Sequence, residues 1–217
     1  MITKVFGPPG SGKTTFLLDV VQKELSSGTS PLNIGYFSFT RKASTEARDR
    51  AVEKFPELDA KNDFPWFRTL HSLAYHCLGA GTKDLMTASD YAVFAKETGL
   101  KVSTTIEGDE FIVQADNAIL NEVNIARIRG EDLRVYYDKS QMDIEWFHFE
   151  FVERAFRHFK EKNLLMDFTD LLERLNDHPE LLPNLDVLIV DEAQDLSRLQ
   201  WRLVEHLEGK SQRCFLG

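Results

Sequence analysis

In the regions near both ends of the chain, hydrophobic and polar positions follow two patterns in turn, one typical of strands and one typical of helices. Short runs typical of strands are each followed by a stretch in which apolar residues recur every three or four positions, as they do along one face of a helix. The predicted strands cover residues 1–6, 33–40, 66–70, 185–190 and 213–216. The predicted helices cover residues 43–54, 71–78, 167–176 and 197–208, and a further helix begins at Lys13. Strands that alternate with helices indicate an α/β fold built on a parallel sheet.

The middle of the chain has a different pattern. After the turn-forming residues 79–82, the segment up to residue 163 is acidic, helical in its periodicity and poor in strand signals. We therefore expect residues 79–163 to form an inserted helical subdomain, and residues 1–78 and 164–217 to form the α/β domain that it interrupts. Five apolar residues of the insertion recur at helical spacing, and we expect the face that they share to be a packing surface: Ile144, Phe147, Phe151, Ala155 and Phe159.

The composition is that of a soluble globular protein. Of the 217 residues, 42% are hydrophobic and 28% are charged, which excludes a disordered tail or a fibrous protein. The longest aliphatic run, at 185–190, is too short to span a bilayer, and the first residues lack the apolar stretch of a signal peptide. Two cysteines are too few for a disulfide framework. We expect a cytoplasmic protein with reduced cysteines and no membrane partner.

The net charge of −9, from 26 basic and 35 acidic residues, argues against a nucleic-acid-binding protein. The excess of acidic residues lies in the segment 79–217, however, and a basic cluster precedes it: Arg41, Lys42, Arg48 and Arg50. An acidic protein can still present such a cluster as a local basic patch. An ordinary solvent-exposed helix face is the simpler interpretation, and charge alone favours it.

Gly7-x-x-x-x-Gly12-Lys13-Thr14 is a complete Walker A loop, and it lies between a predicted strand and a predicted helix. Glycines let successive backbone N–H groups turn inward around phosphate oxygens, and the positive end of the following helix dipole adds to the attraction. Lys13 would neutralise the β- and γ-phosphates, and the hydroxyl of Thr14 would bind Mg²⁺. The alternative is a glycine-rich turn that binds no ligand.

Leu188-Ile189-Val190-Asp191-Glu192 is the matching Walker B element, an apolar strand that ends in two carboxylates. Ligands of parallel α/β sheets bind at the carboxyl ends of the strands, so Asp191 is expected beside the Walker A loop, where it would hold Mg²⁺ directly or through water. Glu192 would then orient and deprotonate the attacking water. The alternative, a turn with two solvent-facing acids, is less favoured because the chain also carries a complete Walker A loop.

The segment that follows the Walker B strand resembles a known family. Residues 191–195, Asp-Glu-Ala-Gln-Asp, resemble the DExQD box of superfamily 1 DNA helicases of the UvrD/PcrA/Rep type. Four other segments resemble elements of that family in the same order: residues 37–43 (FTxKA), 67–72 (TxHS), 166–172 (DFxDLL) and 215–217 (the start of the next strand motif). The matches cover about 1–78 and 164–217. The resemblance implies a RecA-like P-loop NTPase fold with an inserted, mostly helical subdomain.

The resemblance also implies a role for each matching residue. ATP and Mg²⁺ would be the cofactors, bound by Gly10, Ser11, Gly12, Lys13, Thr14 and Thr15, with Thr14 and Asp191 at the metal. Catalysis would depend on Glu192, Lys13 and Gln194, and Gln194 would relay hydrolysis to the DNA surface. Single-stranded DNA, or its junction with duplex, would lie along Phe39, Thr40, Arg41, Thr69 and His71. A structural role stays open for two of these, with Phe39 as buried strand core and His71 as a helix cap.

In this family a second RecA-like domain in cis completes the motor and supplies arginine fingers, each worth about 10³–10⁵ in turnover. The resemblance therefore implies that these residues are the N-terminal part of an ATP-dependent DNA helicase or translocase, with weak or no activity alone. Two other functions stay open: a P-loop phosphotransferase acting on a small acceptor, and a non-catalytic nucleotide-gated DNA-binding module. The phosphotransferase does not account for Gln194 or for Thr69-x-His71-Ser72.

Overall fold

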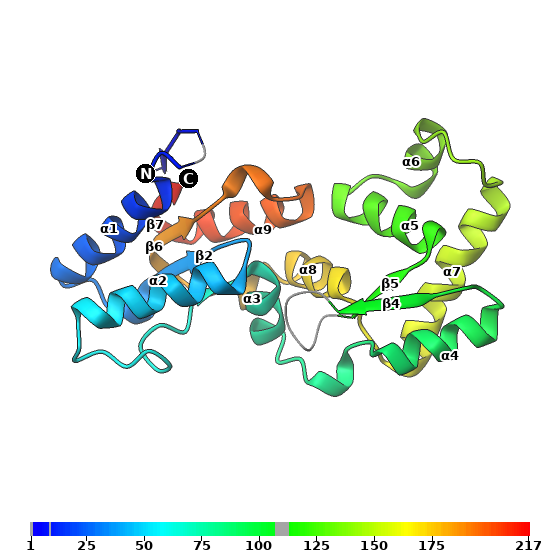
Figure 1. Ribbon diagram of the computed structural model, residues 1–217, viewed down its shortest axis with the longest axis horizontal. Helices are drawn as coiled ribbons and strands as arrows, with labels where there is room; N and C mark the ends of the chain where they lie inside the picture. The colour runs from blue at the N-terminus through cyan, green and yellow to red at the C-terminus, as the bar shows by residue number, and fades with distance from the viewer. Residues whose placement is uncertain (1, 9, 107–112) are drawn as a thin grey trace. The chain divides into compact units, whose positions relative to one another are not determined.

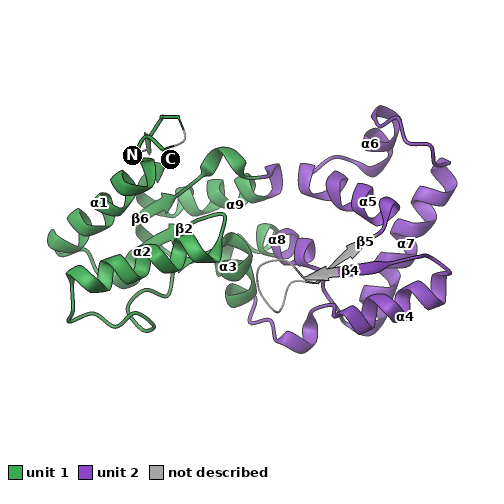
Figure 2. Ribbon diagram, in the orientation of Figure 1, with its two compact units in different colours: residues 1–77, 175–196, 200–217 green, residues 78–174, 197–199 purple. Residues whose placement is uncertain are grey.

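The computed structural model describes residues 2–8, 10–106 and 113–217. The chain divides into two compact units, each made of segments that are separated in the sequence (Figure 2). The first unit comprises residues 1–77, 175–196 and 200–217, and the second comprises 78–174 and 197–199. The chain thus leaves the first unit after residue 77 and returns to it at residue 175.

The first unit is built on a five-stranded parallel sheet (Figure 1). The strands lie in the order β1-β7-β6-β2-β3, and their bounds are β1 (Ile2–Lys4), β2 (Ile34–Phe37), β3 (Phe67–Arg68), β6 (Leu185–Val190) and β7 (Ser211–Leu216). The adjacent strands pair in parallel. The central strand, β6, is almost wholly buried, which is why its sequence is a nearly continuous apolar run. The predicted α/β fold with a parallel sheet is confirmed.

Helices connect these strands and cover the sheet. They are α1 (Lys13–Ser26), α2 (Arg41–Lys54), α3 (Leu70–Cys77) and α9 (Arg198–Gly209), with 3₁₀ turns at Pro31–Asn33, Pro179–Leu181 and Ala193–Asp195. On one face, Leu17 of α1 and Ala47 of α2 share a core with Ile189 of β6. Alternate strand residues such as Phe37 and Leu188 point to the opposite face because of the pleat, and they are buried as well. These elements agree with the predicted ones to within a few residues.

The second unit is mainly helical, as predicted. It contains α4 (Ala88–Thr98), α5 (Ala118–Arg129), α6 (Leu133–Lys139), α7 (Trp146–Asn163), most of α8 (Phe168–Asp177) and a 3₁₀ turn at Thr82–Asp84. It also contains an antiparallel pair of strands that the sequence analysis missed, β4 (Ser103–Ile106) and β5 (Val113–Asp116). The β-branched residues within 102–106 are a strand signal, but the run is short and lies in a strongly helical segment. Within the described ranges, no helix is both long and apolar enough to cross a bilayer.

α7 carries apolar residues on two sides, and only part of the predicted packing face lies against the core of the second unit, namely Phe159, with Ile144 and Ala155 partly buried beside it. The buried residues of α7 are Phe149, Val152, Phe156, Phe159 and Lys160. Of the predicted packing face, Phe159 is buried, whereas Phe147 and Phe151 are 76% and 50% exposed. The prediction was wrong for these two rings because aromatic side chains occupy four of the six positions 146–151, so that periodicity alone cannot select one face.

Five charged side chains of the second unit form a cluster that we call the α5–α8 ion cluster: Arg127, Lys160, Asp167, Asp170 and Glu173. Arg127 of α5 pairs with all three acids, at 2.7 Å, 2.5 Å and 2.6 Å in that order. Lys160 of α7 pairs with Asp167 at 2.7 Å and with Asp170 at 2.6 Å. Burial by itself would raise the pKa of Asp167, but the charges of Arg127 and Lys160 outweigh it and hold the pKa well below its ordinary value.

The α5–α8 ion cluster explains why residues 164–174 group with the second unit, although the sequence analysis assigned them to the α/β domain. This stretch contains the whole segment that resembles DFxDLL, residues 166–172. Asp167 and Asp170 cap α8 reciprocally, since the backbone N–H of each donates to the carboxylate of the other at 2.8 Å or less. The same two carboxylates bind Arg127 and Lys160, so the start of α8 is attached to α5 and α7.

Candidate nucleotide and DNA sites

The segments that carry the predicted site residues meet at one edge of the five-stranded sheet. The Walker A loop follows β1, the FTxKA-like segment follows β2, the TxHS-like segment follows β3, and Asp191 follows β6. Because these strands are parallel, all four segments lie at the carboxyl edge of the sheet. In the strand order, β6 lies between β1 on one side and β2 and β3 on the other. The Walker B residues therefore separate the Walker A loop from the two segments predicted to contact DNA.

The Walker A loop has the backbone that its glycines predict. Gly10 and Gly12 have positive φ values of 80° and 88°, which favour glycine, and a Cβ atom at either position would point into open space. Gly12 is the N-cap of α1, whose first turn has no acidic residue and no side-chain cap. No side chain of the helix therefore competes for its first N–H groups. Of the other predicted nucleotide residues, Ser11, Thr14 and Thr15 are exposed and Lys13 is half-buried.

Thr14 and Asp191 are distant in the sequence but in contact in the structure. The Thr14 hydroxyl donates to Oδ1 of Asp191 at 3.3 Å, and the same oxygen accepts the backbone N–H of Glu192 at 3.1 Å. Asp191 is only 2% exposed. A hydroxyl beside a carboxylate provides hard oxygen donors that suit Mg²⁺, which usually takes its other ligands from water and phosphate. Among the described residues, no group of three or more His, Cys, Asp or Glu side chains is arranged to hold a metal by itself.

One residue of this site, Tyr36 of β2, was not predicted from the sequence. Its hydroxyl donates to Oδ2 of Asp191 at 2.8 Å, and its side chain is fully buried. Burial and the adjacent carboxylate raise the pKa of Tyr36 well above its ordinary value, so the hydroxyl stays protonated and acts as a donor. A signal was available, because a tyrosine within a buried strand needs a partner for its hydroxyl. The partner itself depends on the register between β2 and β6.

Glu192 has a left-handed backbone, with φ 56° and ψ 41°. This conformation costs a residue other than glycine about 1–2 kcal/mol, and such residues cluster at functional sites. The N–H of Glu192 donates to Asp191, and its carbonyl accepts the N–H of Asp195 at 3.0 Å, so both ends of the residue are held. The amide of Gln194 donates to the Glu192 carboxylate, which brings these two predicted catalytic residues together. The third, Lys13, has no hydrogen bond or ion pair with any described residue.

Phe39 and Thr40 lie between β2 and α2, and their side chains have different surroundings. Phe39 is 57% exposed, which excludes the alternative that it is buried strand core. Thr40 is the N-cap of α2, since its hydroxyl accepts the N–H of Ala43 at 3.2 Å. Arg41 begins α2 and is exposed. An exposed ring beside a helix N-terminus is a surface on which a nucleic-acid base could stack.

The basic cluster around α2 is partly neutralised within the helix. Arg50 pairs with Glu46 at 2.6 Å, and Arg48 lies 3.8 Å from the carboxylate of Asp49. The Arg50–Glu46 pair is exposed, as is typical of a solvated helix face, and contributes little stability. The basic residues nearest to Phe39 in the chain are Arg41 and Lys42.

Thr69 and His71 lie on the segment that follows β3. The Thr69 hydroxyl accepts the N–H of Ser72 at 3.2 Å, so the capping role that was considered for His71 belongs to Thr69. His71 is half-buried, and burial lowers its pKa to about 4. Its imidazole is therefore neutral at pH 7, and any contact with DNA would be a hydrogen bond rather than an ion pair with phosphate.

The sequence matches the family described as UvrD/REP helicase N-terminal domain over residues 2–217. The chain belongs to this family. A "Probable DNA helicase II homolog" of Mycoplasma pneumoniae is 26% identical over 98% of this chain and 32% of its own length, and a "Probable DNA helicase" of the same organism is 27% identical over 99% and 43%. "DNA helicase II" of Haemophilus influenzae is 24% identical over 95% of this chain and 30% of its own length. The chain thus spans less than half the length of each relative.

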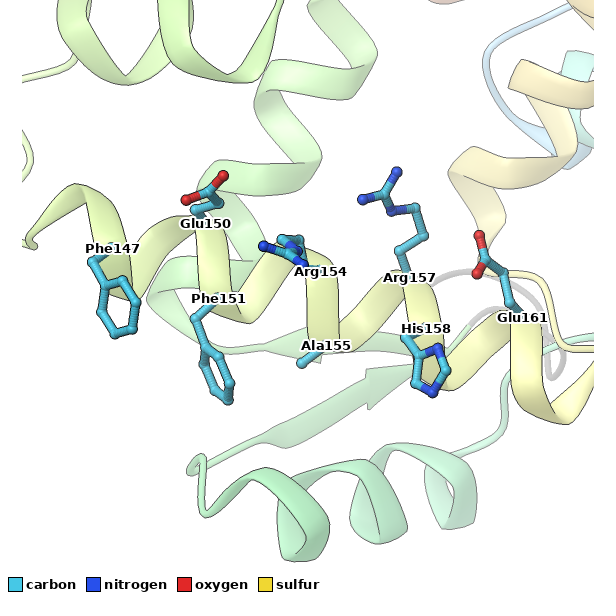
Figure 3. A pocket seen from close by; sticks show the side chains of 8 residues that line it. All are labelled: Phe147, Glu150, Phe151, Arg154, Ala155, Arg157, His158 and Glu161. Atoms are coloured by element: carbon cyan, nitrogen blue, oxygen red, sulfur yellow. The ribbon is translucent and has the colours of Figure 1, made fainter.

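The five-stranded parallel sheet agrees with the RecA-like domain expected of this family. A separate hollow of about 540 Å³ lies along α7 in the second unit. Figure 3 shows an apolar row beside a charged row on this helix, and the lining residues are Phe147, Glu150, Phe151, Arg154, Ala155, Arg157, His158 and Glu161. The hollow contains none of the predicted site residues, so it is distinct from the predicted nucleotide site.

Proposed function

We propose that the intact protein is an ATP-dependent DNA helicase or translocase and that this chain is its ATP-binding motor domain. The observation that carries the proposal is the contact between Thr14 and Asp191, because it joins the Walker A and Walker B elements in one pair of oxygen donors. Family membership supports the same function, as do the relatives named DNA helicase II and probable DNA helicase.

The Walker A loop suits a nucleoside triphosphate. The open space beside Gly10 and Gly12 leaves room for phosphate oxygens against the backbone, and the N-terminus of α1 attracts their charge. Lys13 is available for the β- and γ-phosphates because it has no partner among the described residues. Thr14 and Asp191 would hold Mg²⁺, whose positive charge would stabilise the phosphate oxygens during transfer. Ser11 and Thr15 complete the set of polar groups around the nucleotide, and we propose ATP and Mg²⁺ as the cofactors.

Glu192 and Gln194, in the segment that follows the Walker B strand, would have separate roles in hydrolysis. Glu192 would take the proton of the attacking water, since its carboxylate follows Asp191 directly and its backbone is held on both sides. Gln194 donates a hydrogen bond to that carboxylate. When the carboxylate takes a proton during hydrolysis, the hydrogen-bond acceptor of the Gln194 amide therefore changes. Gln194 can thereby transmit the state of the nucleotide to the neighbouring segments at the same sheet edge.

We propose single-stranded DNA, or its junction with duplex, as the ligand of the segments that follow β2 and β3. β2 is adjacent to β6 in the sheet, so Phe39 and Thr40 are one strand away from Asp191 and Glu192. Phe39 would stack on a base, whereas Thr40, Arg41, Thr69 and His71 would contact the DNA backbone. A second RecA-like domain in cis would complete the cleft. Its closure on ATP and its reopening after hydrolysis would move the protein along DNA.

Replacing Lys13 with alanine is expected to weaken ATP binding by about 10- to 150-fold, because one charge-assisted interaction with phosphate is lost. The measurement is titration of the intact protein with a fluorescent ATP analogue, together with ATP turnover with and without single-stranded DNA. Lys23→Ala, which removes an exposed lysine from the last turn of α1, is the matched control and should change neither value. Turnover that DNA does not stimulate would favour the phosphotransferase, and binding without turnover would favour the non-catalytic module.

Replacing Phe39 with alanine is expected to weaken binding of single-stranded DNA by about 5- to 150-fold, since stacking on one base contributes about 1–3 kcal/mol. ATP affinity without DNA should not change. Phe39 is a cleaner test than Thr40, whose replacement would also remove the cap of α2 and destabilise the protein by about 0.5–2 kcal/mol. Fluorescence anisotropy of a labelled oligonucleotide measures the effect. Phe147→Ala is the control, and an equal loss in both variants would remove Phe39 from the DNA surface.

A further inference from the structure

Tyr36 connects the interior of the sheet to the proposed metal site. The hydroxyl of Tyr36 binds Oδ2 of Asp191, while Oδ1 of the same carboxylate receives the Thr14 hydroxyl. The two oxygens therefore have separate partners, one from β2 and one from α1. Because Asp191 is almost completely buried, each of its oxygens needs a hydrogen-bond partner, and Tyr36 is the side-chain partner of Oδ2.

The register of the sheet explains why a tyrosine fills this role. Tyr36 pairs with Ile189 on β6, and Asp191 lies two residues further along the chain, directly after the end of β6. Its hydrogen bond with the Tyr36 hydroxyl puts its carboxylate on the same face as Tyr36 and Ile189. Two residues of a strand span about 6.6 Å, and a tyrosine side chain is long enough to cover this step. A serine or threonine at position 36 would be too short to reach the carboxylate.

Neighbouring residues fix the tyrosine ring in this orientation. The ring stacks on Phe67 of β3, with 5.6 Å between the ring centres and 20° between the planes. The backbone N–H of Tyr36 donates to the carbonyl of Trp66 at 3.0 Å. The side chain has no exposed surface and belongs to the core formed with α1 and α2. The packing of the ring therefore fixes the position of the hydroxyl.

We propose that Tyr36 is a positioning residue for the metal site, holding Asp191 so that Oδ1 faces Thr14. This inference rests on the proposed function, because it requires that Asp191 helps to bind Mg²⁺. Groups that orient a metal ligand from behind typically contribute 10- to 100-fold to metal affinity. Without the hydroxyl, Oδ2 loses its partner and the carboxylate can rotate away from Thr14. Binding of the nucleotide without metal does not depend on this orientation and should be unaffected.

The test is the Tyr36→Phe variant of the intact protein, which removes the hydroxyl and keeps the ring. The dissociation constant of a fluorescent ATP analogue is measured in MgCl₂ and in EDTA. The ratio of the EDTA value to the MgCl₂ value reports how much Mg²⁺ strengthens binding. We expect Tyr36→Phe to reduce this ratio by about 10- to 100-fold, or to one if the wild-type ratio is smaller, with no change in EDTA. Tyr91→Phe, in the buried core of the second unit, is the matched control and should leave the ratio unchanged.

Asp191→Asn and the double variant show whether Tyr36 acts through Asp191. If it does, Tyr36→Phe should change the ratio no further once Asp191 has been replaced, because two residues that act as a unit are not additive. Additive effects, or a lower melting temperature with an unchanged ratio, would overturn the positioning role and leave Tyr36 as a core residue. A wild-type protein that binds the analogue equally in MgCl₂ and EDTA would overturn the proposed metal site itself.

Discussion

Replacing Glu192 with glutamine is expected to reduce ATP turnover of the intact protein by about 10²–10⁴-fold while leaving ATP affinity unchanged. Glutamine has nearly the same shape as glutamate but cannot accept a proton from water. The hydrogen bonds that hold the backbone of Glu192 involve its own N–H and carbonyl, so they survive the substitution, and the side-chain carbonyl of glutamine can still accept the Gln194 amide. The loss should therefore appear in the chemical step, which single-turnover hydrolysis in the presence of single-stranded DNA measures directly.

Glu205→Gln is the matched control for this loss of charge, because Glu205 is exposed on α9 of the same unit. It should leave both ATP affinity and turnover within about twofold of the wild type, since surface substitutions usually change free energies by about 0.5 kcal/mol or less. Retained turnover in Glu192→Gln would show that another group takes the proton. A large loss of ATP affinity would show instead that Glu192 contributes to binding.

Replacing Arg127 with methionine is expected to lower the free energy of unfolding of the second unit by about 3–5 kcal/mol. The guanidinium is the partner of three acids, and removing it leaves Asp167 buried with Lys160 as its remaining cationic partner. The cap of α8 uses the same carboxylates, so the start of that helix should loosen as well. Urea unfolding gives the loss of stability, and hydrogen exchange of peptides from α5, α7 and α8 locates it.

Arg157→Met is the control, because Arg157 is exposed and pairs with Glu153 on the same helix, α7. It should lower the free energy of unfolding by less than about 1 kcal/mol.

The dependence of stability on acid pH gives a second test of the role of Arg127. The pKa of Asp167 is lower in the folded protein than its ordinary value, so its ion pairs stabilise the fold fully above about pH 4, and this contribution falls as the pH decreases further. Arg127→Met should lose less stability on acidification than the wild type does. An equal acid dependence in both proteins would show that Arg127 does not set this pKa.

Much of the geometry of the proposed nucleotide site could be predicted because its signals are local in the sequence. The glycine spacing of the Walker A loop specifies a backbone, and the structure shows the positive φ values at Gly10 and Gly12 that this backbone needs. The apolar run of β6 specifies a buried central strand, which puts Asp191 at the carboxyl edge of the sheet. The roles of Thr40 and Thr69 as helix caps were missed, although a threonine directly before a helical pattern is itself a local capping signal.

The sequence alone determined the alternation of strands and helices, the inserted helical segment and the Walker A and B elements, because each is a pattern of neighbouring positions. The tertiary structure decided which side chains from distant segments meet. It buried Phe149 rather than Phe147, because in a helix with aromatic residues on two faces only tertiary packing determines which face is buried. It joined Arg127 to the acids around α8, and it brought Tyr36 to Asp191. These contacts depend on strand register and helix packing, which are properties of the assembled chain and not of any one segment.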